Sequence, residues 1–156
     1  MKVEQVMRSE ARYVSPTADL ATAGRTMAEV GCGVLPVVDD SSRVVGVVTD
    51  RDLCLTLARL DRRPSEVAVS QAMSREVYAC AVGDDLRRAL ATMEGFRVRR
   101  LPVLGADGTL HGILSLDDVA LAAHAQVTGG LGDTLFADVG RTLAAICEHP
   151  TLVLAH

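Results

Sequence analysis

The feature that most constrains this chain is an internal repeat. When the sequence is shifted by 66 residues against itself, residues 1–58 align with residues 67–124 without a gap, and 15 of the 58 aligned pairs are identical. Such self-similarity far exceeds chance and indicates two copies of one structural unit. A unit of about 60 residues is too small to bury its own sheet face. We therefore expect the two copies to pack together, sheet to sheet, as one globule.

Both copies predict the same order of elements. In each copy a short strand leads into an amphipathic helix that follows Asp19 or Asp85, which stand in N-cap position. A β-hairpin comes next, since polar turn residues separate two aliphatic runs of strand length, and a second helix begins at Thr49 or Ser115. The order per copy is thus β-α-β-β-α. The expected strands lie at residues 12–14, 35–38 and 44–48 and, in the second copy, at 77–80, 101–104 and 110–114.

The repeat gives the chain a four-part organisation. We expect repeat 1 at residues 1–60, a linker at 61–66, repeat 2 at 67–125 and a C-terminal extension at 126–156. The extension begins with a glycine-rich linker and contains one helix, at about 133–147, whose apolar face is formed by Leu135, Val139, Leu143 and Ile146. The predicted fold class is α/β in the α+β sense: two β-α-β-β-α repeats packed with pseudo-two-fold symmetry, plus a C-terminal helix.

Composition disfavours several classes of function. Aromatic residues make up 3% of the chain, so no aromatic platform is expected to stack bases or sugars. The net charge is −4 and no run of basic residues is longer than two, which disfavours nucleic-acid binding. The cysteines and histidines show no metal-ligand spacing, and no apolar run approaches the ~18 residues of a membrane span. We expect a cytoplasmic protein with reduced thiols, no metal site and no membrane contact.

The sequence shows no catalytic constellation. Ser15, Ser65 and Ser115 lie in no nucleophile elbow, and no histidine has a spacing that would make it their base. The paired aspartates Asp117 and Asp118 are explained by the favourable dipole at a helix start. We therefore predict no catalytic residues and no enzymatic activity.

Two stretches of sequence carry a resemblance to a known family. Residues Gly46–Asp52 (GVVTDRD) and Gly112–Asp118 (GILSLDD) each lie downstream of a Leu-Pro-Val. In this pattern each repeat resembles the cystathionine-β-synthase (CBS) domain, and the tandem pair resembles a Bateman module. The chain is similar to small stand-alone bacterial proteins that carry a CBS pair and a short extension.

The resemblance implies a regulatory ligand rather than a required cofactor. CBS pairs hold adenosyl ligands, such as AMP, ADP, ATP or S-adenosylmethionine, in clefts between the two repeats. The ribose and phosphate positions of the family match Thr49 and Asp52 and, in repeat 2, Ser115 and Asp118. The adenine-lining positions match Ser15, Pro16, Leu35 and Pro36. Repeat 2 has Ser115 in place of Thr49 and Val82 in place of Pro16, so its cleft fits the pattern less well.

The same residues also have a structural interpretation, which stays open beside the functional one. Thr49-x-x-Asp52 and its counterpart have the form of a helix N-cap followed by an acid at the third helical position. A carboxylate at a helix start accepts two vicinal hydroxyls, while helix N-terminal amides favour a phosphate. Capping and ligand binding are therefore compatible.

Repeat 2 carries a group of arginines, Arg97, Arg99 and Arg100, just before its Leu-Pro-Val. Repeat 1 has glycine, glycine and valine at the corresponding positions. Arginine forks suit the oxygens of a di- or triphosphate, which makes these residues candidate phosphate ligands. The alternative is a solvated edge on which the arginines pair with surface acids.

The sequence thus predicts a regulatory module that senses an adenine nucleotide or adenosyl compound between its repeats and signals through its conformation. The alternative is a dimerising protein-interaction module that binds no nucleotide and presents its tail to another protein. The resemblance implies a homodimer, and the sequence does not name the effector protein.

Overall fold

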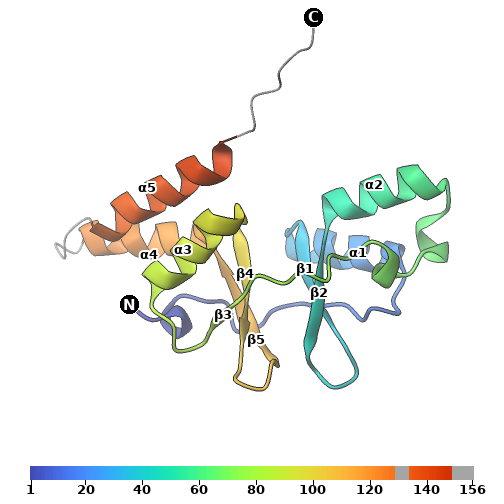
Figure 1. Ribbon diagram of the computed structural model, residues 1–156, viewed down its shortest axis with the longest axis horizontal. Coiled ribbons are helices and arrows are strands. Elements are labelled where there is room, and N and C mark those ends of the chain that lie inside the picture. The colour runs from blue at the N-terminus through green and yellow to red at the C-terminus, as the bar shows by residue number, and fades with distance from the viewer. Residues whose placement is uncertain (129–133, 149–156) are drawn as a thin grey trace, which may run out of the picture. The chain divides into compact units, whose positions relative to one another are not determined.

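The computed structural model describes residues 1–128 and 134–148 of the chain, and its elements follow the predicted order in both copies (Figure 1). The first copy contains α1 (Leu20–Val30), β1 (Val34–Val38), β2 (Val44–Thr49) and α2 (Asp50–Leu60). The second contains β3 (Cys80–Ala81), α3 (Leu86–Phe96), β4 (Arg100–Leu104), β5 (Leu110–Ser115) and α4 (Leu116–Thr128). Helix α5 (Thr134–Cys147) follows, and 3₁₀ turns lie at η1 (Val3–Gln5), η2 (Pro64–Glu66) and η3 (Val69–Gln71). The mixed α/β class is confirmed.

The first strand of each copy is shorter than predicted. At residues 12–14 only Val14 pairs, as a parallel bridge to Val37: Val14 N–H donates to the Pro36 carbonyl at 3.1 Å, and Val38 N–H donates to the Val14 carbonyl at 2.9 Å. The next bond of a parallel ladder would need an N–H from Pro36, which proline lacks. Pro102 stands in the same place in β4, and the partner strand β3 again begins level with Val14, at Cys80.

Both predicted N-caps are present. The Thr22 N–H donates to Asp19 Oδ1 at 2.7 Å, and the Arg87 N–H donates to Asp85 Oδ1 at 3.0 Å. These backbone hydrogen bonds lower the pKa of both carboxyls below the ordinary value. Each cap starts a helix that buries an apolar face: Leu20, Ala23 and Met27 in α1, and Leu86, Ala89, Leu90 and Met93 in α3.

The chain forms two compact units, and neither is one continuous repeat. The repeat-1 unit contains residues Ser9–Tyr78 together with Leu104–Gly112. The repeat-2 unit contains Met1–Arg8, Ala79–Val103 and the described residues from Ile113 onward. The leading segment of each copy, with its 3₁₀ turn, therefore packs in the unit built from the other copy's first helix.

The two exchanged segments make equivalent backbone hydrogen bonds. In the repeat-1 unit, Val69 N–H donates to the Ala18 carbonyl at 2.8 Å, and Leu20 N–H donates to the Val67 carbonyl at 2.9 Å. The repeat-2 unit has both bonds 66 residues away, from Val3 to Asp84 at 2.9 Å and from Leu86 to Met1 at 3.0 Å. Val3 and Val69 are each 0% exposed, so the exchanged segments are part of the cores.

The core of the repeat-1 unit is aliphatic, as the scarcity of aromatic residues requires. Its buried members are Val14, Leu20, Ala23, Met27, Leu35, Val37, Val48, Leu53, Val67 and Val69. They come from α1, both strands of the hairpin, α2 and the exchanged segment. This core fixes the start of α2 relative to β1 and β2.

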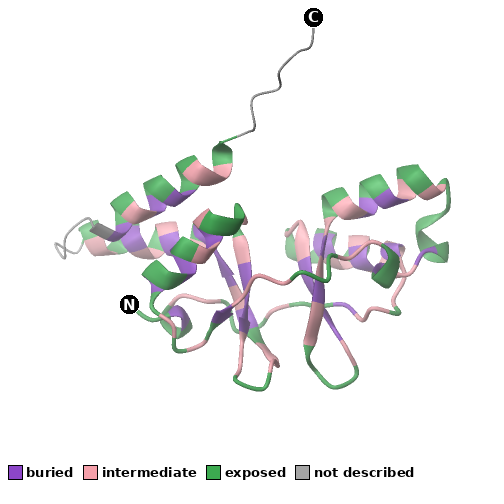
Figure 2. Cartoon of the chain, in the orientation of Figure 1, coloured by how far each residue is buried: buried purple, intermediate pink, exposed green. Residues whose placement is uncertain are grey.

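Helix α5 packs against α3 and α4 in the repeat-2 unit (Figure 1). Leu135 and Val139 are buried, as expected, whereas Leu143 is exposed and Thr142 takes the buried place beside them. Figure 2 shows that buried and exposed segments alternate along α5. The glycine-rich segment expected before this helix falls at residues 129–133, outside the described residues. None of the helices in the described part of the chain is long and apolar enough to cross a membrane.

Candidate functional site

The candidate site of repeat 1 lies where β2 ends and α2 begins. Thr49 is opposite Val34 in the hairpin and caps α2. Its N–H and Oγ1–H both donate to Asp52 Oδ2, at 2.9 and 2.7 Å, and Asp52 N–H donates back to Thr49 Oγ1 at 3.1 Å. The predicted capping arrangement is therefore present. Among the described residues Asp52 Oδ1 has no hydrogen-bond or ion-pair partner, so this oxygen is available to accept from a ligand.

Repeat 2 builds the same arrangement with serine. Ser115 N–H donates to Asp118 Oδ2 at 3.2 Å, the Ser115 hydroxyl donates to the same oxygen, and Asp118 N–H donates to Ser115 Oγ at 3.0 Å. The other carboxylate oxygen differs from its counterpart in repeat 1. Asp118 Oδ1 accepts from Arg8 Nε at 3.0 Å in an ion pair. The residue 66 positions after Arg8 is Ser74, whose hydroxyl donates to the Glu76 carbonyl at 3.2 Å.

A second close contact defines the start of α2. Asp50 N–H donates to the Gly33 carbonyl at 3.0 Å, as Leu116 N–H donates to the Arg99 carbonyl at 2.9 Å in repeat 2. A Cβ on Gly33 would lie 2.6 Å from Asp50 Oδ2, so a larger residue here would require the exposed Asp50 side chain to move. The start of α2 thus carries two carboxylates, on Asp50 and Asp52. This local negative charge suits hydroxyl donors or a cation better than a phosphate.

The expected adenine-lining residues lie in β1 and in the segment that follows its bridge partner Val14. Leu35 is 1% exposed and its side chain fills the core, and Pro36 is buried as well. Ser15 and Pro16 are half-buried and follow Val14, which bridges Val37 on the edge of β1 away from β2. Val37 lies three positions after Val34, the partner of Thr49, and this spacing corresponds to roughly 10 Å along the strand.

Two of the three candidate phosphate arginines have acidic partners. Arg97 donates to the Glu148 carbonyl at 3.2 Å and lies 3.7 Å from its carboxylate. Arg100 lies 3.8 Å from the Asp117 carboxylate. Arg99 is exposed, and its side chain makes no hydrogen bond or ion pair within the described part of the chain. Arg97 and Arg100 thus have acidic neighbours, and the phosphate-binding role of the three arginines stays a prediction.

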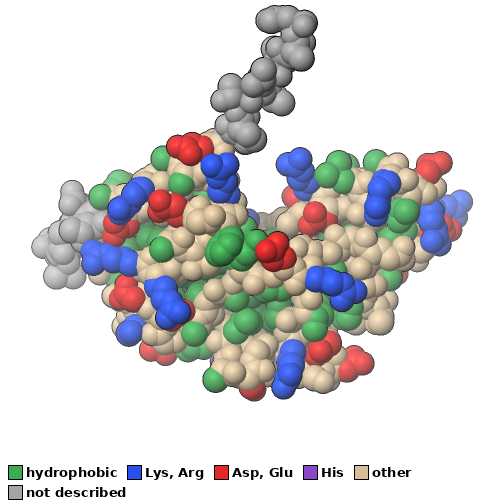
Figure 3. All heavy atoms as spheres, in the orientation of Figure 1, with side chains coloured by type: hydrophobic (Ala, Val, Ile, Leu, Met, Phe, Trp, Pro, Cys, Tyr) green, Lys and Arg blue, Asp and Glu red, His purple; other side chains and the backbone are tan. Residues whose placement is uncertain are grey.

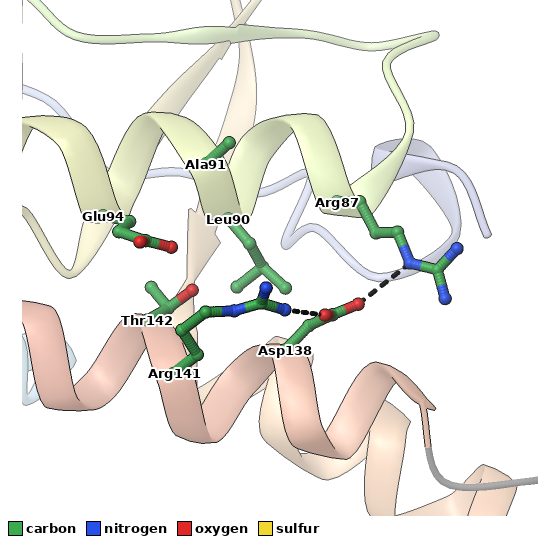
Figure 4. Close-up of a pocket in the computed structure, with 7 residues that line it drawn as sticks. All are labelled: Arg87, Leu90, Ala91, Glu94, Asp138, Arg141 and Thr142. Carbon is green, nitrogen blue, oxygen red and sulfur yellow. Dashed lines mark hydrogen bonds and ion pairs between the residues drawn. The ribbon is translucent and has the colours of Figure 1, made fainter.

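Two hollows in the described surface are lined by other residues. One, of about 270 Å³, lies between α3 and α5 and is lined by Arg87, Leu90, Ala91, Glu94, Asp138, Arg141 and Thr142 (Figure 4). Asp138 joins the two helices there: it accepts from Arg87 Nε at 2.9 Å and pairs with Arg141. The charges of this hollow balance. A hollow of similar size in the repeat-1 unit is lined by Ser9, Glu10, Ala11, Tyr13, Val38, Ser42 and Leu110.

The described surface carries charges of both signs (Figure 3). Acidic and basic side chains are interspersed on the face shown in Figure 3. Within residues 1–128 and 134–148, no three histidine, cysteine or acidic side chains are grouped so as to hold a metal ion. The polar groups of the candidate site are thus the Thr49 hydroxyl and the carboxylates of Asp50 and Asp52 at the start of α2.

Sequence reasoning missed Arg8 and Gly33. Arg8 lies 110 residues from Asp118 in sequence, and no local pattern connects them. The sequence did give an indication for Gly33, because it lies two positions before the Leu-Pro-Val of repeat 1, where repeat 2 has Arg99.

Comparisons with known proteins agree with this fold. The family model of the CBS domain matches residues 3–59 and 69–125. An uncharacterized 17.7 kDa protein of Acidianus ambivalens is 31% identical over 121 residues, which are 78% of this chain and 72% of that protein. The crystal structure of CBSX2 in complex with AMP has 30% identity and a TM-score of 0.69 and covers 81% of this chain and 98% of CBSX2. A CBS domain protein of Thermoplasma acidophilum has 22% identity and a TM-score of 0.70, over 92% and 76% of the two chains, and supports the fold.

Proposed function

The chain belongs to the CBS-domain family, with two copies of the domain in tandem, and we propose that it is a regulatory module for an adenine nucleotide or another adenosyl compound. The ligand binds at the Thr49–Asp52 motif of the repeat-1 unit. The observation that carries the proposal is the unpartnered Oδ1 of Asp52, held at the start of α2 by the capping bonds on Oδ2. The AMP complex of CBSX2, a relative with the same fold, supports the choice of ligand class.

The chemistry of the motif favours the ribose as the group bound there. Two vicinal hydroxyls donate to a carboxylate without adding charge, and Asp52 is fixed in place before the ligand arrives. The Thr49 hydroxyl already donates its proton to Asp52 at 2.7 Å, so it has none to give a phosphate. With two carboxylates, Asp50 and Asp52, in the first turn of α2, AMP or S-adenosylmethionine fits better than ATP, whose larger negative charge these carboxylates repel more strongly.

We infer a regulatory rather than a catalytic role from the same contacts. The polar side chains of the motif are engaged in capping α2, and none is a histidine or cysteine placed to exchange protons with a ligand. Ligand binding stabilises one conformation of the pair, and an effector protein responds to that conformation.

A thermal-shift panel of AMP, ADP, ATP and S-adenosylmethionine tests the proposal. A ligand at about 100 times its dissociation constant stabilises the folded state by roughly 2.7 kcal/mol, a rise of several degrees in melting temperature. Asp52→Asn is the most informative variant. Its amide oxygen can still accept the capping bonds from Thr49, while its amide nitrogen replaces the free acceptor Oδ1 by a donor. We expect it to melt like the wild type without ligand and to lose the shift. The proposal is wrong if no member of the panel shifts the wild type.

A second candidate function is protein interaction through α5. Phe136 and Leu143 are exposed and lie seven positions apart on one flank of α5, beside its buried face, with Gly140 between them along the helix. Such an apolar stripe suits contact with a second copy of the chain. The double variant Phe136→Ser, Leu143→Ser is expected to shift a dimer to monomer in sedimentation velocity. An unchanged sedimentation coefficient argues against this stripe as the interface.

A further inference from the structure

The two copies of the helix-start motif differ in one charged contact. Asp118 Oδ1 accepts from Arg8 Nε at 3.0 Å, whereas Asp52 Oδ1 has no partner among the residues described. The capping bonds on the other carboxylate oxygen are the same in both copies. The difference therefore lies at the oxygen that faces a ligand, not at the one that holds the helix.

Backbone hydrogen bonds fix Arg8 in this place. Arg8 N–H donates to the Ile113 carbonyl at 2.9 Å, and Ile113 N–H donates back at 3.0 Å, two residues before Ser115. In the repeat-1 unit Val47 and Ser74 exchange the same two bonds, at 3.0 and 2.9 Å. Position 74 thus has the same backbone register beside its motif as position 8. Only the side chain differs: an arginine in one case and a serine in the other.

The guanidinium of Arg8 competes directly with a ribose. A charge-assisted hydrogen bond from arginine to a carboxylate is stronger than a bond from a neutral hydroxyl. The Asp118 side chain is only 10% exposed, so removing the cation would leave a nearly buried carboxylate without its counter-charge. A neutral diol cannot replace that charge. A nucleoside at repeat 2 must therefore displace Arg8 at a cost that a nucleoside at repeat 1 does not meet.

We propose that Arg8 decides which of the two motifs takes a ligand. Its guanidinium occupies the acceptor oxygen of Asp118 and closes the repeat-2 motif, so the chain binds one adenosyl ligand, at Asp52. This inference rests on the proposed function of the Asp52 motif. It makes Arg8 a specificity-determining residue, although it lies in the exchanged N-terminal segment, far in sequence from either motif.

The test exchanges the two side chains between the copies. Equilibrium dialysis with radiolabelled AMP and, in parallel, S-adenosylmethionine measures the ligands bound per chain. We expect one in the wild type, two in Arg8→Ser, and one in Arg8→Ser combined with Asp52→Asn. Arg8→Ser should tighten binding at the repeat-2 motif by about tenfold or more, as expected for loss of a competing charged hydrogen bond. The reciprocal variant Ser74→Arg should bind none, because its guanidinium reaches Asp52.

Stability measurements keep these outcomes interpretable. The Arg8 side chain is 71% exposed but its partner Asp118 is only 10% exposed, so Arg8→Ser is expected to lower the melting temperature by leaving Asp118 without its counter-charge. Binding is therefore measured at a temperature at which the variant is folded, and a ligand-induced rise in melting temperature no larger in Arg8→Ser than in the wild type overturns the inference.

The binding results separate the two proposals. If the wild type binds neither probe, the proposed function fails and the inference falls with it. If the wild type binds one ligand and Arg8→Ser still binds one, the function stands and Arg8 does not close the second motif. Two ligands on the wild type, or loss of binding in Arg8→Ser, also overturns the inference, since Arg8 would then tolerate or hold the ligand.

Discussion

Val69 offers a direct test of the exchanged segments. It belongs to the second copy in sequence, yet it is fully buried in the repeat-1 unit with α1 and the hairpin β1–β2. Val69→Ala should therefore destabilise the unit of the first copy. The matched control is Val3→Ala, which belongs to the first copy in sequence, is equally buried, and lies in the repeat-2 unit.

The size of the effect follows from complete burial. Val→Ala removes the equivalent of two methylene groups, which contribute about 0.8 kcal/mol each when buried. Incomplete relaxation around the cavity adds up to roughly 1 kcal/mol. Each variant should thus lose about 1.6–2.6 kcal/mol in the affected unit. That loss raises the exchange rate of protected amides by roughly 15- to 70-fold, at tenfold per 1.4 kcal/mol.

Hydrogen exchange measured by NMR resolves the two units in one experiment. Val69→Ala should accelerate exchange of the protected amides in α1 and β2, with a smaller change in α3 and β4, and Val3→Ala should give the reverse. If Val69→Ala accelerates amide hydrogen exchange more in α3 and β4 than in α1, then residue 69 does not pack in the repeat-1 unit and the prediction is wrong. Equal acceleration throughout would show that the two units unfold together, contrary to the prediction.

Two further predictions concern ionisable groups. Burial raises the pKa of the Cys80 thiol to about 12, so iodoacetamide should alkylate exposed Cys54 near neutral pH and spare Cys80 until urea unfolds the chain, as followed by mass spectrometry. The capping residues Asp19 and Asp85 have folded-state pKa values below the ordinary 3.8. Their contribution to the free energy of unfolding is therefore present above about pH 4 and is lost as the pH falls through the folded-state pKa. The difference in melting temperature between wild type and Asp19→Ala should accordingly shrink below that pH, and a difference that stays constant down to pH 2 would contradict it.

The sequence predicted the elements whose determinants are local. Asp19 caps α1 because its side chain reaches an N–H three residues away, and such a signal is legible in a single segment. The hairpin strands agree with the prediction to within one residue, because turn residues and aliphatic runs define both ends. The first strand was overestimated, since its limit is the missing N–H of Pro36 in a different segment.

The remaining features depend on contacts between distant segments. The two copies have the same residue at Val3 and Val69, which indicates that both are buried. It does not say in which unit each one packs, because both units offer equivalent backbone hydrogen-bond partners. The face of α5 was also only partly predictable. Helical spacing favours Leu143 for burial, yet packing against α3 and α4 buries Thr142 instead. At the candidate site the capping bonds could be predicted, whereas the ion pair on Asp118 could not.

The two copies can be compared position by position, so a side chain that differs between them need not be required by the fold. Both copies keep the same backbone bonds at the exchanged segment and the same capping bonds at the helix start, so the fold imposes the same demands on each. The fold therefore does not require an arginine at position 8, since serine occupies the equivalent position 74 in the same register. An arginine there changes only the charge beside the carboxylate. The arginine at position 8 brings a cation to the motif of repeat 2, whereas the serine at position 74 brings none to the motif of repeat 1. We therefore expect the two motifs to bind an adenosyl ligand with unequal affinity.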